Sequence, residues 1–115
     1  MSEPRRISTP WSYSSAVEAG DYVFLAMHRG TGDDFTTQFH DTLANLKKTL
    51  AAFDMTLANL VKINIWLKNV EDIRIYEKLF REYFKEGKYP ARMGATTEFV
   101  DEDCLMMLEG TAWRG

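Results

Sequence analysis

Short apolar and aromatic runs, broken by glycine-bearing turns, open the chain. Residues 13–17 and 21–28 are predicted to be two strands joined across Glu18-Ala19-Gly20. The run Tyr22-Val23-Phe24-Leu25 favours a strand because β-branched and aromatic side chains pack well on a sheet. Gly20-Asp21 supplies the flexible turn residues. This pattern predicts a β-hairpin.

Two later segments carry apolar residues at helical spacing. Residues 35–53 form the clearest helix, and Asp33 or Asp34 can cap its start. A second stripe predicts a helix from about residue 70 to Glu86, stopped by Gly87. In the first helix, large apolar side chains recur every three or four positions along one face: Phe39, Leu43, Leu46, Leu50 and Phe53.

Three further strands are predicted at residues 60–68, 91–98 and 104–113. The order β-β-α-β-α-β-β indicates an α+β fold, in which a mixed sheet carries two helices on one face. Two helices cannot cover both faces of such a sheet. Large apolar groups on the other face, including Trp66, Met107 and Trp113, therefore predict oligomerisation with closed symmetry.

Length and composition limit the domain organisation and the class of partner. The 115 residues suit one domain, expected at residues 11–115 after a flexible segment at residues 1–10. The formal net charge of −3 disfavours nucleic-acid binding, since it provides no basic field. The single cysteine, Cys104, and the lack of a Cys/His cluster predict a reducing compartment and no metal. Apolar runs are too short to span a bilayer, so a cytoplasmic protein is expected. No cofactor is expected either.

Arg92 is the first candidate site residue. It is the only charged group between Tyr89 and Glu98. A guanidinium on an apolar strand needs an anion, because an unpaired buried charge is costly. That anion is either a ligand carboxylate or a protein side chain in a structural salt bridge. Gly94 falls on the same strand face and can leave its backbone open to a ligand.

Three other titratable residues are candidate site residues. Glu77 lies at the edge of the second helical stripe, where it could act as a general acid or base or lean out into water. Glu109 lies within the apolar last strand and could pair with Arg92 or Lys62. His28 ends the second strand beside a glycine-bearing loop, as a proton relay or as an exposed loop histidine.

The chain resembles the YjgF/RidA (endoribonuclease L-PSP-like) family from about Tyr13 to Trp113. The order and spacing of the matching stretches carry the resemblance, and the Pro-Ala-Arg element is its clearest marker. The stretches are residues 13–24, Thr42-Leu43-Ala44-Asn45-Leu46-Lys47, residues 60–68, Tyr89-Pro90-Ala91-Arg92 and Leu108-Glu109-Gly110-Thr111-Ala112.

The resemblance implies a homotrimer of chorismate-mutase-like subunits, with a central barrel of sheets, helices outside and ligand clefts between subunits. Enzymes of the family hydrolyse enamines and imines to 2-oxo acids and ammonia without a cofactor. Arg92 matches the arginine that holds the substrate carboxylate. Tyr13 matches a tyrosine that lines the cleft, and Gly94 matches the residue whose backbone contacts the ligand. The substrate class implied is therefore a small carboxylate or a 2-oxo or imino acid.

Three positions depart from the family pattern. Met107 stands where the family has the glutamate that positions water, and Glu109 matches the second acidic residue of that strand. Ala26 replaces a small hydroxyl residue, and Glu77 falls on a family asparagine. Either Glu77 replaces the missing carboxylate, or a register shift brings Glu109 to the position of Met107.

These departures leave more than one function open. The first is imine or enamine hydrolysis, with Glu77 or Glu109 as the catalytic carboxylate. The second is a non-catalytic trimer that binds a metabolite or a partner protein, with Met107 lining the cleft. Ribonuclease or translation inhibition, a label that some family members carry, is the least favoured because the chain is acidic and lacks a pair of catalytic histidines.

Overall fold

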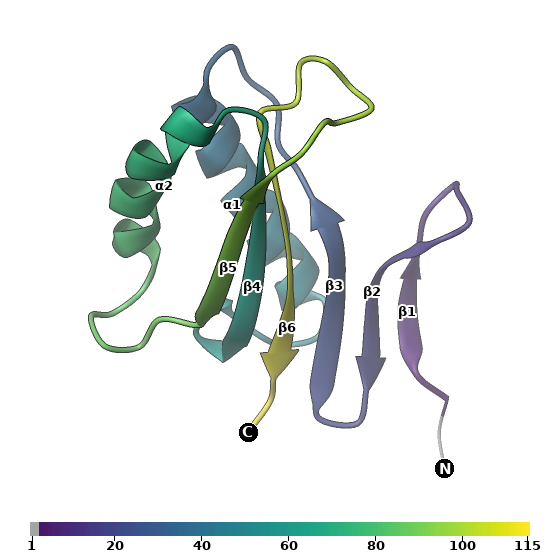
Figure 1. Cartoon of the computed structure of the whole chain (residues 1–115). Helices are drawn as coiled ribbons and strands as arrows, with labels where there is room; N and C mark the ends of the chain where they lie inside the picture. Colours follow the sequence, from purple (N-terminus) through teal and green to yellow (C-terminus); the bar gives the residue numbers. More distant parts are fainter. Residues whose placement is uncertain (1–2) are drawn as a thin grey trace.

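The computed structural model describes residues 3–115, which form one mixed sheet with both helices on the same side (Figure 1). This arrangement confirms the predicted α+β class and the order of the elements from the hairpin onward. The strands are β1 (Arg5–Ser8), β2 (Ser14–Ala19), β3 (Tyr22–His28), β4 (Leu60–Leu67), β5 (Ala91–Thr96) and β6 (Met106–Trp113), and the helices are α1 (Phe35–Ala51) and α2 (Ile73–Phe80).

The six strands follow the order β1-β2-β3-β6-β4-β5 across the sheet. Only the β4–β5 pair is parallel, and every other neighbouring pair is antiparallel. The crossover from β4 to β5 runs through α2, as a parallel connection requires. Strands β1 and β5 are therefore the two free edges of the sheet, and β5 is the edge beside α2 (Figure 1).

Helix α1 forms where its apolar stripe predicted, and its start is set by Asp34. The Asp34 side chain accepts a hydrogen bond from the Thr37 N–H at 2.8 Å, which satisfies one free donor of the first turn. The stripe residues are fully buried against the sheet: Phe39, Leu43, Leu46 and Leu50. Burial of four such side chains contributes about 1.5–3 kcal/mol each.

Helix α2 is shorter than predicted. It is flanked by 3-10 turns at Val70–Asp72 and Arg81–Tyr83, and the backbone becomes extended at Phe84 instead of continuing to Glu86. The ring of Phe84 stacks on Phe80, with centroids 4.6 Å apart. The helix thus ends through the 3-10 turn at Arg81–Tyr83, although the local sequence would allow another turn.

Strand β1 was not predicted. It lies within the segment 1–10 that we expected to be flexible, and it raises the number of strands from the expected five to six. Its residues pair with β2, and Arg5 Nε lies 2.6 Å from Glu18 Oε1. The four residues show no clear alternation of apolar and polar groups, because the strand is an exposed edge held mainly by backbone pairing.

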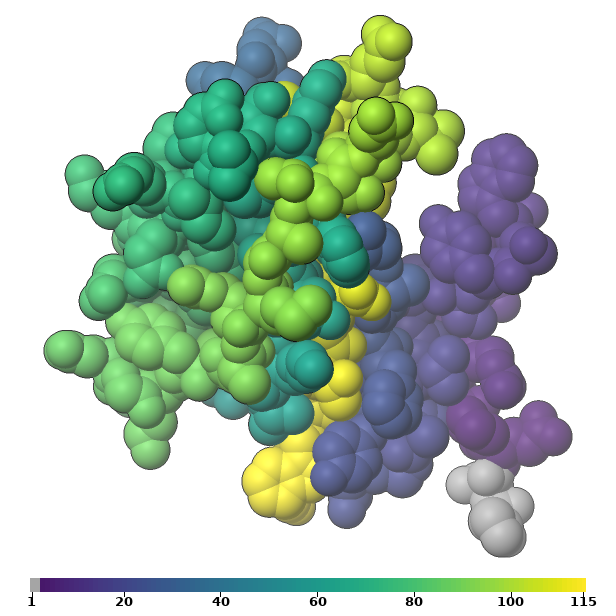
Figure 2. Space-filling model, in the orientation of Figure 1, coloured from purple at the N-terminus to yellow at the C-terminus, as the bar shows by residue number. Residues whose placement is uncertain are grey.

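The face of the sheet away from the helices carries large apolar side chains that remain exposed in the single chain. No helix covers this face in the view of Figure 2, where side chains of the central strands reach the surface. The exposed fractions are large for aromatic and methionine side chains: Tyr22 45%, Phe24 49%, Met93 58% and Trp113 46%. Exposed apolar side chains gathered on one sheet face favour a surface for interaction with another molecule.

Candidate functional site

Arg92 lies on the edge strand β5, on the face that carries the helices. It pairs in register with the buried Ile63 of β4, so its side chain projects toward α2. The guanidinium carbon stands over two rings of that helix, 5.1 Å from the Tyr76 centroid and 5.5 Å from the Phe80 centroid. Stacking on aromatic faces holds a guanidinium while leaving its in-plane N–H groups free to bind an anion.

Glu77 reaches the same guanidinium from α2. Its Oε2 lies 2.7 Å from Arg92 Nη2, and its Oε1 lies 3.4 Å from Arg81 Nη2 one turn later. Glu77 Oε2 is nevertheless a buried polar atom without a hydrogen-bond partner within residues 3–115. The contact with Arg92 is therefore a close ion pair whose N–H does not point well at the oxygen. One oxygen of Glu77 thus faces the Arg92 site, while the side chain as a whole is 42% exposed.

A cavity of about 270 Å³ opens beside this ion pair. That volume suits a ligand of a few non-hydrogen atoms and is slightly below the range of ordinary ligand pockets. Its walls combine two guanidinium groups, one carboxylate and two aromatic rings, together with a proline. They are contributed by Glu77, Phe80, Arg81, Tyr89, Pro90 and Arg92.

Gly94 lies two residues beyond Arg92 on the same strand face. A Cβ there would stand 2.9 Å from Ile65 Cγ2, so close packing against β4 favours glycine at this position. The Thr97 N–H donates to Leu67 O at 2.9 Å, which shows which amides of this strand turn toward β4. Because successive amides alternate sides, the Gly94 N–H points to the free edge of the sheet.

Tyr13 lies far from this cavity within one chain. It precedes β2, beside the edge strand β1, and its side chain is more than half exposed. Arg92 lies on β5 at the other edge, with four strands between β1 and β5. The fold therefore does not bring these two predicted site residues together in a single subunit.

Met107 and Glu109 project from the face of β6 that carries no helix. Met107 pairs in register with Trp66, and Glu109 pairs with Asn64. Glu109 Oε1 accepts a hydrogen bond from Trp66 Nε1 at 3.1 Å, so its partner is neither Arg92 nor Lys62. Within one chain, Glu77 is the predicted site carboxylate that the fold places beside Arg92.

Tyr76 and Arg81 are site residues that the sequence interpretation missed. Tyr76 was assigned only to the apolar stripe, yet its fully buried hydroxyl lacks a hydrogen-bond partner within residues 3–115 and lies near Arg92. Burial raises the pKa of Tyr76 above its ordinary value, so the hydroxyl stays protonated. Arg81 could have been found from its position four residues after Glu77, because such helical pairs face each other.

His28 is buried, in contrast to the exposed loop histidine considered above. Its Nδ1–H donates to Ala26 O at 2.7 Å, and its Nε2 lies 2.8 Å from Thr49 Oγ1. Burial lowers the pKa of His28 below its ordinary value, because the charged ring loses solvation. The ring connects β3 to α1 and lies outside the Arg92 cavity.

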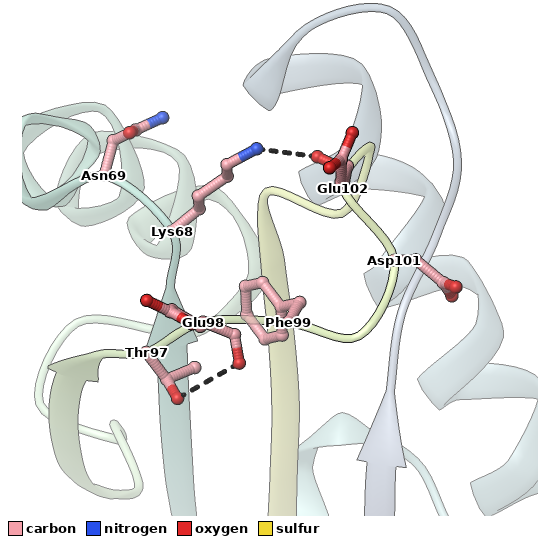
Figure 3. Close-up of a pocket in the computed structure, with 7 residues that line it drawn as sticks. All are labelled: Lys68, Asn69, Thr97, Glu98, Phe99, Asp101 and Glu102. Carbon is pink, nitrogen blue, oxygen red and sulfur yellow. Dashed lines mark hydrogen bonds between the residues drawn. The ribbon is translucent and has the colours of Figure 1, made fainter.

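A second cavity, of about 470 Å³, lies at the other end of β5 (Figure 3). It is bounded by Lys68 and Asn69 after β4 and by the loop from Thr97 to Glu102. Lys68 Nζ donates to the main-chain oxygen of Glu102 at 2.7 Å. Three carboxylates line this cavity and Lys68 is its one cation, so its charge does not suit a carboxylate ligand.

The part of the chain that the structure describes shows no helix long and apolar enough to cross a membrane. Among the same residues, no three histidine, cysteine, aspartate or glutamate side chains gather as ligands for a metal ion.

Comparison with known proteins places these features in a family context. Residues 4–113 match the family described as endoribonuclease L-PSP. A RutC family protein of Pyrococcus horikoshii is 30% identical over 110 residues, which cover 89% of this chain and 86% of that protein. A 2-iminobutanoate/2-iminopropanoate deaminase of Dermatophagoides farinae is 30% identical over 106 residues, covering 80% and 82%.

The fold also has close counterparts among solved structures. A YjgF-family protein of Neisseria meningitidis superposes with a TM-score of 0.92 at 23% identity, covering 98% of this chain and 96% of that one. This likeness concerns the fold, because identity at that level does not carry site chemistry.

Proposed function

This chain belongs to the endoribonuclease L-PSP (YjgF/RidA) family, and on that premise we propose that it binds a small 2-imino or 2-oxo carboxylate at Arg92. The reaction proposed is hydrolysis of imine or enamine intermediates to 2-oxo acids and ammonia, without a cofactor. The relative named as a 2-iminobutanoate/2-iminopropanoate deaminase supports this choice. The observation that carries it is the Glu77 carboxylate 2.7 Å from the Arg92 guanidinium at the wall of a cavity.

Arg92 is proposed to hold the substrate carboxylate. Its guanidinium is fixed by the Tyr76 and Phe80 rings, and a planar fork of N–H donors matches a carboxylate in bidentate fashion. The outward N–H of Gly94 is proposed to donate a further hydrogen bond. Charge-assisted bonds of this kind contribute roughly 1.5–3 kcal/mol each.

We further propose that the working assembly is a homotrimer and that Tyr13 enters the site from a neighbouring subunit. Tyr13 and Arg92 belong to opposite edges of one sheet, so they can meet only between two copies of the chain. Association through the face with the exposed aromatic residues would bury Tyr22, Phe24 and Trp113. The same association would bring Met107, on that face, toward an intersubunit cleft.

Hydrolysis needs a group that removes a proton from water, and Glu77 is the proposed general base. The water oxygen bonds to the imine carbon while its proton passes to the Glu77 carboxylate. In the tetrahedral intermediate, Glu77 returns its proton to the nitrogen and the hydroxyl gives up the second water proton to the nitrogen as the C=O bond forms. The C–N bond breaks, ammonia leaves, and a 2-oxo acid remains. General acid–base assistance of this kind accelerates a reaction by about 10²–10⁴-fold.

The alternative is a trimer that binds the same carboxylates without turning them over. The position of Glu109 favours it, because this glutamate hydrogen-bonds Trp66 on the other face of the sheet. Met107, where the family has its water-positioning glutamate, offers no proton acceptor.

Decay of 2-iminobutanoate, followed with wild type, Arg92→Ala and Glu77→Gln, tests the proposal. Wild type should accelerate the decay, Arg92→Ala should lose the acceleration, and Glu77→Gln should lower it by about 10²-fold or more. Equal decay with wild type and Arg92→Ala would rule out the enzymatic function. Calorimetric binding of 2-oxobutanoate without any turnover would select the non-catalytic alternative.

A further inference from the structure

We propose that Glu77 is a built-in counter-ion of Arg92 that selects ligands carrying a protonated nitrogen next to their carboxylate. The inference rests on the proposed carboxylate site and adds a preference within it. Amino acids and protonated imino acids would be favoured over 2-oxo acids of the same carbon skeleton. The preference arises from what happens to the Glu77 carboxylate when a ligand takes Arg92.

The two oxygens of Glu77 have different surroundings. Oε1 faces Arg81, whose side chain is mostly exposed, at 3.4 Å. Oε2 is buried and has Arg92 Nη2 at 2.7 Å as its close positive group. The Arg81 contact is an exposed pair between α2 and the 3-10 turn that follows it, and such a pair contributes little to holding the carboxylate.

A ligand carboxylate that binds Arg92 takes over the positive charge that Glu77 Oε2 faces. A buried anionic oxygen without a positive partner or a hydrogen bond is costly. A 2-oxo acid offers only a carbonyl oxygen beside its carboxylate, so it adds a repulsive acceptor there. An ammonium or iminium nitrogen on the adjacent carbon supplies N–H donors and a positive charge, and it can replace Arg92 as the partner of Oε2.

The buried hydroxyl of Tyr76 is an independent sign that a polar group belongs at this place. The residue is completely buried, and its hydroxyl lacks a hydrogen-bond partner within residues 3–115. Its hydroxyl lies near the Arg92 guanidinium, and Glu77 follows it directly on α2. Unpartnered buried polar groups are rare in native proteins, so this hydroxyl near the Arg92 guanidinium indicates that a polar ligand group belongs there.

The test compares the affinity for 2-aminobutanoate with that for 2-oxobutanoate, measured by calorimetry on the full chain. Wild type should prefer the amino acid. In Glu77→Gln the ratio of the two dissociation constants should shift about tenfold or more toward 2-oxobutanoate, the change expected for one charge-assisted hydrogen bond. Glu82→Gln is the matched control, because it removes the same charge from an exposed residue outside the cavity.

The outcomes separate this inference from the proposed function. If Arg92→Met abolishes binding of both ligands but Glu77→Gln keeps the wild-type ratio, the selectivity inference is wrong and the carboxylate site stands. A Glu82→Gln shift as large as that of Glu77→Gln also overturns the inference, since it would reflect net charge. Wild-type affinity in Arg92→Met, or no binding of either ligand to wild type, refutes both proposals.

Discussion

Replacement of Gln38 by methionine should destabilise the protein strongly, because this side chain joins three segments of the fold. Gln38 lies on α1 and is 1% exposed. Its Nε2 donates to Gly32 O at 3.0 Å and to Asp103 O at 2.7 Å, while its Oε1 accepts from the Leu105 N–H at 2.8 Å. One amide thereby fixes the loop before α1 and the loop that leads into β6.

The size of the effect follows from these three bonds. Each buried hydrogen bond contributes about 1 kcal/mol net, and a partner left buried without a bond costs about 1–3 kcal/mol. Methionine keeps the approximate length of the side chain, so little cavity is created. The expected loss for Gln38→Met is therefore roughly 3–5 kcal/mol, a large part of the 5–15 kcal/mol typical of a domain.

Arg29→Met is the matched control, because the partly buried Arg29 holds the same loop through exposed carboxylates. Its guanidinium lies 3.2 Å from both Asp101 and Asp103, and those carboxylates are mostly exposed. Exposed ion pairs contribute about 0–1 kcal/mol each, so this variant should lose only about 1 kcal/mol.

Urea unfolding, extrapolated to water at one fixed protein concentration, measures both variants. A loss below about 1 kcal/mol in Gln38→Met, or an equal loss in Arg29→Met, would contradict the role assigned to the three Gln38 hydrogen bonds.

Three further substitutions test other parts of the structure. Because burial lowers the pKa of His28, the free energy of unfolding should stay constant above pH ~6.5. Below that pH it should fall by at most ~1.4 kcal/mol per pH unit. Urea unfolding at several pH values should show that His28→Gln lacks this fall. Tyr76→Phe removes a buried hydroxyl that has no protein partner in residues 3–115, so thermal unfolding should change by less than ~1 kcal/mol while calorimetry shows weaker binding of 2-aminobutanoate. Gly110→Ala would place a Cβ 2.4 Å from the Lys62 main-chain oxygen and should cost ~3 kcal/mol by urea unfolding.

The sequence predicted those elements whose local pattern and tertiary packing agree. Helix α1 carries a continuous apolar stripe and a capping aspartate, and both have the expected roles in the structure. The order of the strands from the hairpin onward also follows from patterning, because β3, β4 and β6 each bury alternate side chains. Patterns of this kind reflect which face of an element is buried, so they predict the element correctly from the sequence.

The missed features are those decided by contacts between distant residues. Strand β1 depends on pairing with β2, as between Arg5 and Glu18. The pairing of Arg92 with Glu77 joins two residues fifteen positions apart, on different elements. A sequence shows that the guanidinium of Arg92 requires an anion, but only the fold shows which carboxylate can reach it.

The position of Arg92 at a sheet edge also bears on the proposal that Glu77 replaces the family glutamate. An edge strand exposes one row of amides and leaves its flank open, so groups can approach the guanidinium from the helix layer or from another subunit. Met107 removes a carboxylate from one sheet face, while Glu77 supplies one from α2 on the other face. Because a carboxylate acts through its distance to the reacting atoms and not through the strand that carries it, the chemistry can move between these two positions within one fold.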